Sequence, residues 1–342
     1  MEKKKTKKKI NSSTFLLMIT IVLFAVMYIA GMIIFNDKGF AKPQMFMNLF
    51  ISNAGLIVIG CGMTLVMITG GIDISVGSVT ALVCMSAAYA MENKGMSAVA
   101  AVVISLLIGT LFGIVQGYLV TYLEIQPFIV TLAGMFFGRG LTAVISTDMI
   151  AIQNKTFLKW ANYRINLPFG TYNRRGVFIP AYIYPTVIIA LAVVILITLM
   201  LKFTKFGRSL YAIGGNQQSA VMMGLDVKKT KMKAYVLDGF LAGLGGFLFC
   251  LNSCAGFVEQ AKGLEMDAIA SAVIGGTLLS GGVGTVVGTL FGVLINGTIS
   301  SLITTQGTLS SWWVRITLSA LLCFFIVLQA VIAAVKRKKK KK

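Results

Sequence analysis

Apolar stretches long enough to cross a lipid bilayer recur along this sequence. The first, residues 14–35, is apolar for 22 residues after a Lys-rich beginning, and about 20 apolar residues make a helix that spans the hydrocarbon core. It is too long for a signal-peptide core, and no small-residue cleavage site follows it, so we expect an uncleaved first span. With 57% hydrophobic and 12% charged residues, the whole chain has the composition of a polytopic membrane protein.

The hydrophobic pattern predicts an all-α fold with about ten transmembrane helices and both termini in the cytoplasm. The transmembrane domain occupies residues 14–335, between basic tails at 1–13 and 336–342. After the first span, the expected spans are residues 47–69, 76–90, 97–120, 128–145, 180–201, 234–251, 268–282, 283–303 and 312–335. An even number of spans returns both tails to the same side of the membrane.

Positive charge is concentrated in three places. The net charge of +20 comes mainly from six Lys in the first tail, seven basic residues in the last, and seven in residues 202–233. The positive-inside rule places all three in the cytoplasm, against the anionic leaflet of the lipid bilayer. Residues 147–179 are expected to form an external loop, although they carry five basic residues, Lys155, Lys159, Arg164, Arg174 and Arg175. Topology therefore explains the charge, and no nucleic-acid partner is expected.

The residues that most enzymes need are absent from the sequence. The chain has no His, which removes the commonest general base and metal ligand. Its five Cys lie in apolar runs without the spacing of a metal site, and no G-x-x-x-x-G-K-[ST] phosphate loop occurs. We therefore expect no enzymatic activity, no metal and no cofactor bound by this chain.

The polar segment 202–233 separates two apolar halves and has internal structure of its own. Gly214 and Gly215 are expected to break the chain, and Asn216 can cap the short helix predicted for residues 217–223, which Gly224 can end. A short capped helix held between two membrane spans is suited to contact with another protein. We interpret this segment as a cytoplasmic loop that another protein contacts.

A second interruption, GGIDISVGS at residues 70–78, leaves two interpretations open. One is a discontinuous helix lining a cavity, because unwound backbone is tolerated at membrane depth only inside protein or beside water. The other is a tight turn between two spans, with Asp73 or Ser75 as the helix N-cap. Spacing alone does not distinguish them.

Four sequence blocks carry a resemblance to a known family. GGIDISVGSV, PFIVTLAGMFFGRGL, FGRSLYAIGGNQQSAVMMGLDV and MDAIASAVIGGTLLSGGVGTVVGTLFG occur in the order found in permease subunits of sugar-importing ABC transporters. The chain resembles the ribose, xylose and galactoside group of these permeases over nearly its whole length. Within that group, TLAGMFFGRG, YAIGGN and GTLSSWW are most similar to a permease of the bacterial galactofuranose importer.

The resemblance implies an ABC importer permease fold in the bacterial inner membrane. Such a permease pairs with a second copy or a paralogue. A cytoplasmic ATP-binding subunit holds the ATP and Mg, and an extracytoplasmic sugar-binding protein delivers the substrate. Gly215, Asn216, Ala220 and Gly224 match the family's coupling motif. The resemblance therefore implies that residues 202–233 are the cytoplasmic coupling loop and that the short helix sits in a groove of the ATPase.

The residues that touch sugar are harder to identify from sequence. Amides, carboxylates and other polar groups inside the spans are candidates for a weak polar passage; those we select are Asn53, Asp73, Arg139, Asn252 and Asn296. Arg139 is expected to face protein or a water-filled path, because a charge facing lipid costs about 3 kcal/mol. For each candidate, hydrogen bonding between helices is the more frequent role.

Two alternative functions are kept open. An amino-acid ABC permease of the same superfamily would share the sequence blocks and would be distinguished by competition with unlabelled sugars. An ion-coupled secondary transporter would need an intramembrane carboxylate, for which Asp73, Asp238 and Asp267 are available. Its uptake would survive loss of a partner ATPase but not loss of the proton gradient.

Overall fold

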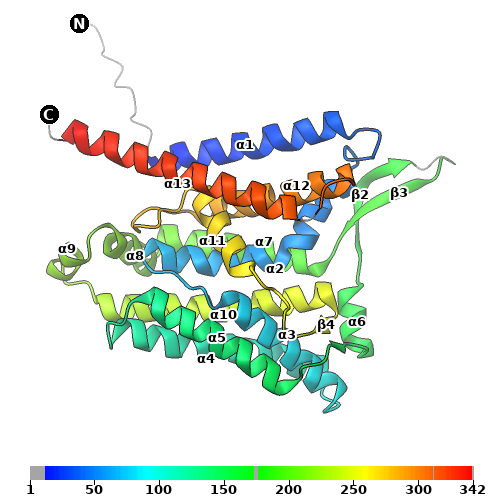
Figure 1. Ribbon diagram of the computed structural model, residues 1–342, viewed down its shortest axis with the longest axis horizontal. Coiled ribbons are helices and arrows are strands. Elements are labelled where there is room, and N and C mark those ends of the chain that lie inside the picture. Colours follow the sequence, from blue (N-terminus) through cyan, green and yellow to red (C-terminus); the bar gives the residue numbers. More distant parts are fainter. Residues whose placement is uncertain (1–11, 173–175, 311, 341–342) are drawn as a thin grey trace, which may run out of the picture.

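A bundle of long helices forms the body of the protein in a computed structural model that describes residues 12–172, 176–310 and 312–340. The helices run roughly side by side along the long axis of the molecule (Figure 1). In chain order the helices are α1 (Ser12–Ile34), α2 (Pro43–Ile68), α3 (Val76–Glu92), α4 (Ala98–Thr121), α5 (Pro127–Ile145), α6 (Lys155–Ala161), α7 (Pro185–Phe203), α8 (Lys205–Gly215), α9 (Gln217–Met222), α10 (Val227–Ser253), α11 (Leu264–Ile274), α12 (Val286–Gln306) and α13 (Trp312–Lys340).

Eight helices of the described chain are long and apolar enough to cross a membrane: α1, α2, α4, α5, α7, α10, α12 and α13. Helices lie at all ten of the predicted positions, but α3 has 17 residues and α11 only 11. At 1.5 Å per residue, α11 is about 16 Å long, roughly half of the hydrocarbon core. The segment predicted as an eighth span is therefore a half-helix followed by non-helical residues 275–285.

The two ends of the bundle differ. Helices α8 and α9 lie at one end, together with the start of α1 and the end of α13, and the β2–β3 hairpin lies at the other (Figure 1). The predicted first tail falls almost wholly outside the described residues, as do Arg174 and Arg175. The predicted last tail is largely a continuation of α13, which is helical as far as Lys340.

The expected external loop contains regular structure that the hydrophobic pattern did not predict. Strands β2 (Ile165–Tyr172) and β3 (Phe178–Ile183) form an antiparallel hairpin with Ile165 opposite Ile183. The two-residue strands β1 (Ile150–Ala151) and β4 (Ala255–Gly256) pair as well. The loop is thereby tied to the end of α10, so the helical fold includes a small β component at this end.

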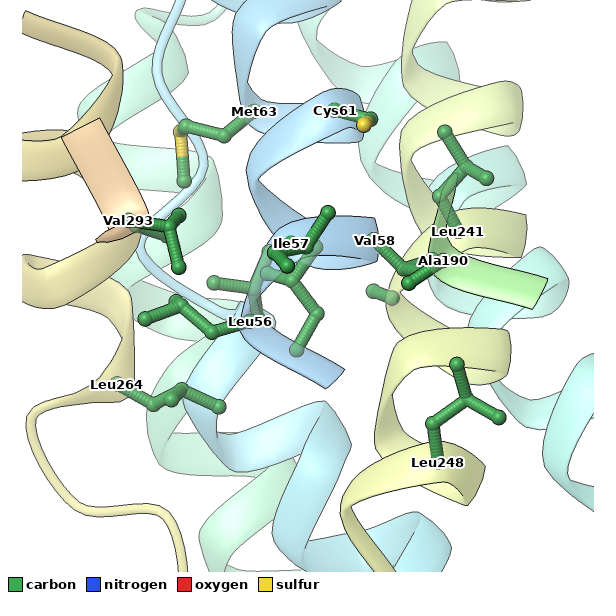
Figure 2. Close-up of a cluster of buried hydrophobic side chains, with 14 of the residues drawn as sticks. Leu56, Ile57, Val58, Cys61, Met63, Ala190, Leu241, Leu248, Leu264 and Val293 are labelled. Atoms are coloured by element: carbon green, nitrogen blue, oxygen red, sulfur yellow. The ribbon is translucent and has the colours of Figure 1, made fainter. Parts of the chain in front are cut away.

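Helix α2 forms the centre of the core. Every residue from 54 to 68 is buried, and a helix that is apolar on all sides is expected to be surrounded by protein. Figure 2 shows its side chains between Leu264 and Val293 on one side and Leu241 and Leu248 on the other. Helices α10, α11 and α12 therefore pack around α2, and polar sites between them are held by a rigid core.

Helices α4 and α10 approach each other through glycines. Gly109 and Gly113 of α4 lie against the backbone of Gly239 and Gly243 of α10. Small residues permit this approach, and van der Waals packing is a main source of helix association in lipid. The glycine stripe noted in the sequence of α4 is thus a contact surface.

We expect Gly113→Val to destabilise the bundle, because a side chain there would meet the carbonyl of Tyr235 and the backbone of Gly239. Overpacking of this kind costs about 1–3 kcal/mol, so thermal unfolding in detergent should begin at a lower temperature. Gly140→Val is the matched control, since nothing lies within 4 Å of a side chain at that exposed position of α5. Equal unfolding temperatures for the two variants would contradict the proposed contact.

Candidate functional site

The cytoplasmic coupling loop predicted from the sequence forms two short helices. Thr204 caps α8 by accepting a hydrogen bond from the Gly207 amide at 3.1 Å, and Asn216 caps α9 by accepting one from the Ser219 amide at 2.8 Å. After α9 the chain turns at Gly224, whose φ of +76° lies in the region that favours glycine. The predicted capping and ending of α9 are confirmed, whereas α8 was not predicted.

Ala220 and the outward surface of α9 have different environments. The Ala220 side chain is fully buried and packs with Ile213 and Val227. The residues that protrude are apolar: Met222 is 87% exposed, and Val221 and Met223 are mainly exposed. The motif residues therefore shape the turn. The exposed side chains of Val221, Met222 and Met223 form its surface, called here the α9 tip. Sequence reasoning missed this surface, although an apolar triplet inside a polar loop was a visible signal.

Helix α8 is packed directly onto the two non-helical breaks of the bundle. The Gly282 amide donates a hydrogen bond to the carbonyl of Ile68, the last residue of α2, at 2.8 Å. Gly214 of α8 lies against both of these groups. The Tyr211 hydroxyl donates to the Gly284 carbonyl, also at 2.8 Å. A displacement of α8 would therefore also displace the end of α2 and residues 275–285.

Helix α10 begins only a few residues after α9. The Asp226 carboxylate caps α10 by accepting a hydrogen bond from the Lys229 amide at 2.9 Å. That bond, with the nearby Lys229 ammonium, holds the pKa of the Asp226 carboxyl below its usual value. The predicted loop 202–233 thus ends at Asp226, and its last residues form the first turns of α10. Motion of α9 would pass into a transmembrane helix without a flexible linker.

A polar cavity of about 600 Å³ lies between α2, α11, α12 and α13. This volume is within the range of small-molecule sites. Asn53 and Asn296 both line it, so the structure brings together two of the predicted residues. The other polar lining residues come from the same four helices: Asn48, Ser52, Asp267, Ser300, Ser301, Thr304, Thr305 and Arg315.

The polar side chains of the cavity repeat at helical spacing. Asn48 and Ser52 are four residues apart on α2, and Asn296, Ser300 and Thr304 continue at the same interval on α12. Such residues share one face of a helix. Asp267 of α11 contacts the Asn296 side chain. This polar stripe within apolar helices was the signal from which most of the lining could have been found.

The other three predicted residues lie elsewhere. Asn252 borders a separate small cavity of about 110 Å³ beside Asn162 and Tyr184. Asp73 is buried in the break before α3, where it accepts hydrogen bonds from Ser75 and lines none of the described cavities. Ser75 is the N-cap of α3 by position, yet its side chain bonds to Asp73 and not to the helix. The break is thus packed inside protein.

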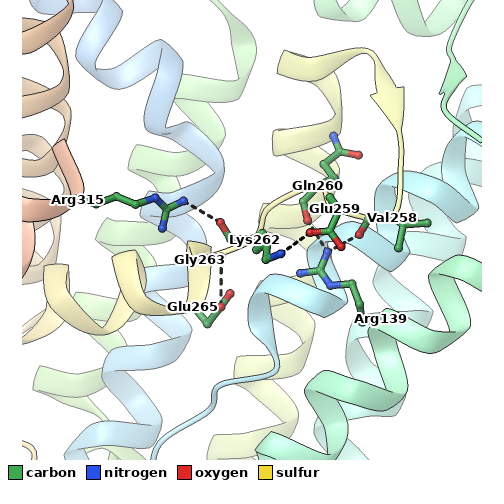
Figure 3. Close-up of polar contacts among 8 residues, drawn as sticks. All are labelled: Arg139, Val258, Glu259, Gln260, Lys262, Gly263, Glu265 and Arg315. Atoms are coloured by element: carbon green, nitrogen blue, oxygen red, sulfur yellow. Dashed lines mark hydrogen bonds and ion pairs between the residues drawn. The ribbon is translucent and has the colours of Figure 1, made fainter. Parts of the chain in front are cut away.

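Arg139 of α5 faces protein, as expected. Its Nη1 atom donates hydrogen bonds to the carbonyls of Val258 and Gln260, at 2.6 and 2.7 Å (Figure 3). From the opposite side, Arg315 of α13 donates to the carbonyl of Lys262 at 3.2 Å. The segment leading into α11 is therefore held by two arginines, and Arg315 also lines the polar cavity.

A cavity with polar lining between apolar, membrane-length helices is the arrangement expected of a membrane permease. Residues 45–326 match the family described as branched-chain amino acid transport system / permease component. The chain is 42% identical to the inner membrane ABC transporter permease protein YjfF of Escherichia coli over 92% of this chain and 91% of that one. It is 35% identical to the fructose import permease protein FruG of Bifidobacterium longum, over 92% and 90%.

The ribose import permease protein RbsC of Bacillus subtilis is 38% identical over 78% of each chain. The chain therefore belongs to this family of ABC transporter permeases. It is a multi-pass protein of the inner membrane, and its family is one of transport subunits and not of enzymes. No solved structure matches it.

We expect Gly214→Ala to disturb the packing of α8, because the added methyl group would meet the Ile68 carbonyl and the Gly282 amide. Both are backbone atoms that cannot move aside cheaply, and the cost should be about 1–3 kcal/mol. Gly215→Ala is the control, with nothing within 4 Å of the new methyl group. Hydrogen exchange of the Gly282 amide should accelerate in the first variant alone. Equal exchange in both variants would contradict the contact.

Proposed function

We propose that this chain forms the translocation path of an ATP-driven sugar importer. It works as a pair with a second copy or a paralogue, receives substrate from an extracytoplasmic sugar-binding protein, and is driven by a cytoplasmic subunit that binds ATP and Mg. The observation that carries the proposal is the lining of the 600 Å³ cavity by amides, hydroxyls, one carboxylate and one guanidinium within an apolar bundle. These groups hydrogen-bond the hydroxyls of a sugar without requiring it to be charged.

Coupling to the ATPase is proposed to run through the α9 tip. Exposed apolar side chains on a polar loop indicate a surface that another protein covers, and Met is adaptable in such contacts. Closure of the ATPase subunits would push α9 and, with it, α8, whose Gly214 lies against both breaks, and would tilt α10. The bundle then passes between outward-open and inward-open states. In this proposal Gly215, Asn216, Ala220 and Gly224 give the tip its shape.

Galactofuranose is the proposed sugar, on the resemblance of the TLAGMFFGRG, YAIGGN and GTLSSWW segments. A specific observation supports an amino-acid substrate as the second candidate. The cavity contains Asp267 and Arg315, which offer one charge of each sign, as the ammonium and carboxylate of a free amino acid would need. Competition of uptake by unlabelled galactofuranose, ribose, fructose and branched-chain amino acids distinguishes the two classes.

We expect Met222→Glu to uncouple the ATPase from transport while the permease still inserts and pairs. Removing one large apolar side chain from a docking surface loses about 1.5–3 kcal/mol, which corresponds to roughly 10–100-fold weaker binding. The measurement is ATPase binding and uptake in proteoliposomes that contain the complete transporter. Lys205→Ala, at an exposed site on the neighbouring helix α8, is the control. Unchanged ATPase binding in Met222→Glu would refute docking at the α9 tip.

We expect Asn296→Leu to reduce sugar uptake by about tenfold, because the amide lines the cavity and a lost hydrogen bond to a substrate costs about 1 kcal/mol or somewhat more. Thr298→Val is the matched control on the same helix. Its hydroxyl is buried, bonds to the Leu294 carbonyl at 2.8 Å and does not line the cavity. Equal uptake by the two variants would place the substrate path elsewhere.

Uptake that a proton ionophore abolishes and that needs no ATP would favour a secondary transporter.

A further inference from the structure

Two buried carboxyl groups meet inside the bundle, away from the polar cavity. Asp73 comes from the break between α2 and α3 and is 3% exposed, and Asp238 comes from α10 and is fully buried. Their side chains lie within hydrogen-bonding reach of each other. In the sequence the two residues are separate candidates for ion coupling, and nothing in their spacing indicates that they would be neighbours.

The hydrogen bonds around the pair are unequal. Asp73 Oδ1 accepts from the Ser75 amide at 2.7 Å and from the Ser75 hydroxyl at 2.6 Å, and Gln116 Nε2 donates to that hydroxyl oxygen at 2.7 Å. Neither carboxyl oxygen of Asp238 receives a hydrogen bond from a protein donor, and the same is true of Gln116 Oε1. A buried carboxylate without a donor is costly, and a proton on one of the two carboxyl groups would supply that donor.

No basic side chain faces the pair in the described part of the chain. The described ion pairs involve neither aspartate. Helix α2 contributes Gly62 beside Asp238, α4 contributes Gln116, and α10 contributes Tyr235, the other titratable group at this place. Tyr235 is 1% exposed, and its hydroxyl lacks a hydrogen-bond partner and lies beside Gly71 of the break. The group therefore holds acids and no compensating cation.

We propose that Asp73 and Asp238 form a proton-binding site, sharing one proton in a carboxyl–carboxylate hydrogen bond. Two ionised carboxylates in contact repel strongly at low dielectric, whereas one proton between them supplies the missing donor. The proposed ligand is a proton, and the described residues contain no group of three His, Cys, Asp or Glu side chains that could hold a metal ion. As the two groups interact closely, the proton belongs to the pair and not to either residue.

The shared proton joins two elements that the transport cycle would move. Asp73 lies in the break that follows Ile68, which is bonded to Gly282, and Asp238 lies on α10, which continues from the α9 tip. A tilt of α10 away from the break would separate the two carboxyl groups and open them to water, where both would ionise. The proton thereby stabilises the conformation described here, and its loss favours the other.

Infrared spectroscopy of the purified full-length chain in liposomes tests the proposal without transport. We expect the carbonyl stretching band of a protonated carboxylic acid at neutral pH, shifted in heavy water and lost in both Asp73→Asn and Asp238→Asn. Asp148→Asn, at an exposed external position, is the control and should keep the band. Absence of the band from the wild type, or its persistence in both variants, would overturn the proposal. Neither result depends on which solute is carried.

A second measurement uses proton linkage and covers the case in which a variant fails to fold. The folded pair holds one proton at neutral pH, and the same aspartates hold almost none when unfolded, so folding stability falls as pH rises. The unfolding equilibrium constant should change by up to tenfold per pH unit until the pair loses its proton. Asp238→Asn keeps a donor toward Asp73 but does not titrate, so this slope should disappear. If Asp238→Asn kept the wild-type dependence of folding stability on pH, a shared proton would be refuted. Stabilisation of the wild type by Na⁺, without the infrared band of a protonated carboxylic acid, would refute it as well.

Discussion

Backbone amides and carbonyls must find partners within a bilayer, and this requirement governs how the chain breaks its helices. The structure meets it by bonding one break to another: the Gly282 amide donates to the carbonyl of Ile68, where α2 ends. Gly70, Gly281 and Gly282 all have positive φ values, a backbone conformation in which a side chain would be strained. A bulky residue at this junction would separate the breaks and leave buried polar groups unpaired. This joint between the two breaks, where Gly282 meets Ile68, therefore depends on glycines, which have no side chain.

The same joint connects features that lie far apart in the sequence. On one side it carries α8, and through the short α9 turn the chain continues into α10. Toward the interior it places Asp73 against Asp238, and residues 275–285 lead from it into α12, which lines the polar cavity with Asn296. The rigid core around α2 holds these parts at fixed distances. A displacement at one end of the bundle therefore has a defined route to the other.

Local sequence patterns predicted the elements whose causes are local. Runs of apolar residues placed the long helices, and Asn216 and Gly224 placed the limits of α9, because capping depends on a few adjacent residues. Contacts between distant segments could not be predicted in this way. The half-length of α11, the hairpin β2–β3 and the meeting of Asp73 with Asp238 depend on packing that no single stretch encodes. Among the candidate path residues, Asn53 and Asn296 share the cavity, whereas Arg139 binds backbone carbonyls of the segment before α11.

The exposed methionines of the α9 tip have a consequence for the chain before it is assembled. Met222 and Met223 present their thioethers to the solvent, and oxidants convert an accessible thioether into a polar sulfoxide. A subunit made in excess of its partners would accumulate this damage at the surface proposed to dock the ATPase. Balanced synthesis of the subunits, and repair by methionine sulfoxide reductases, would then decide how much of the newly made protein is usable.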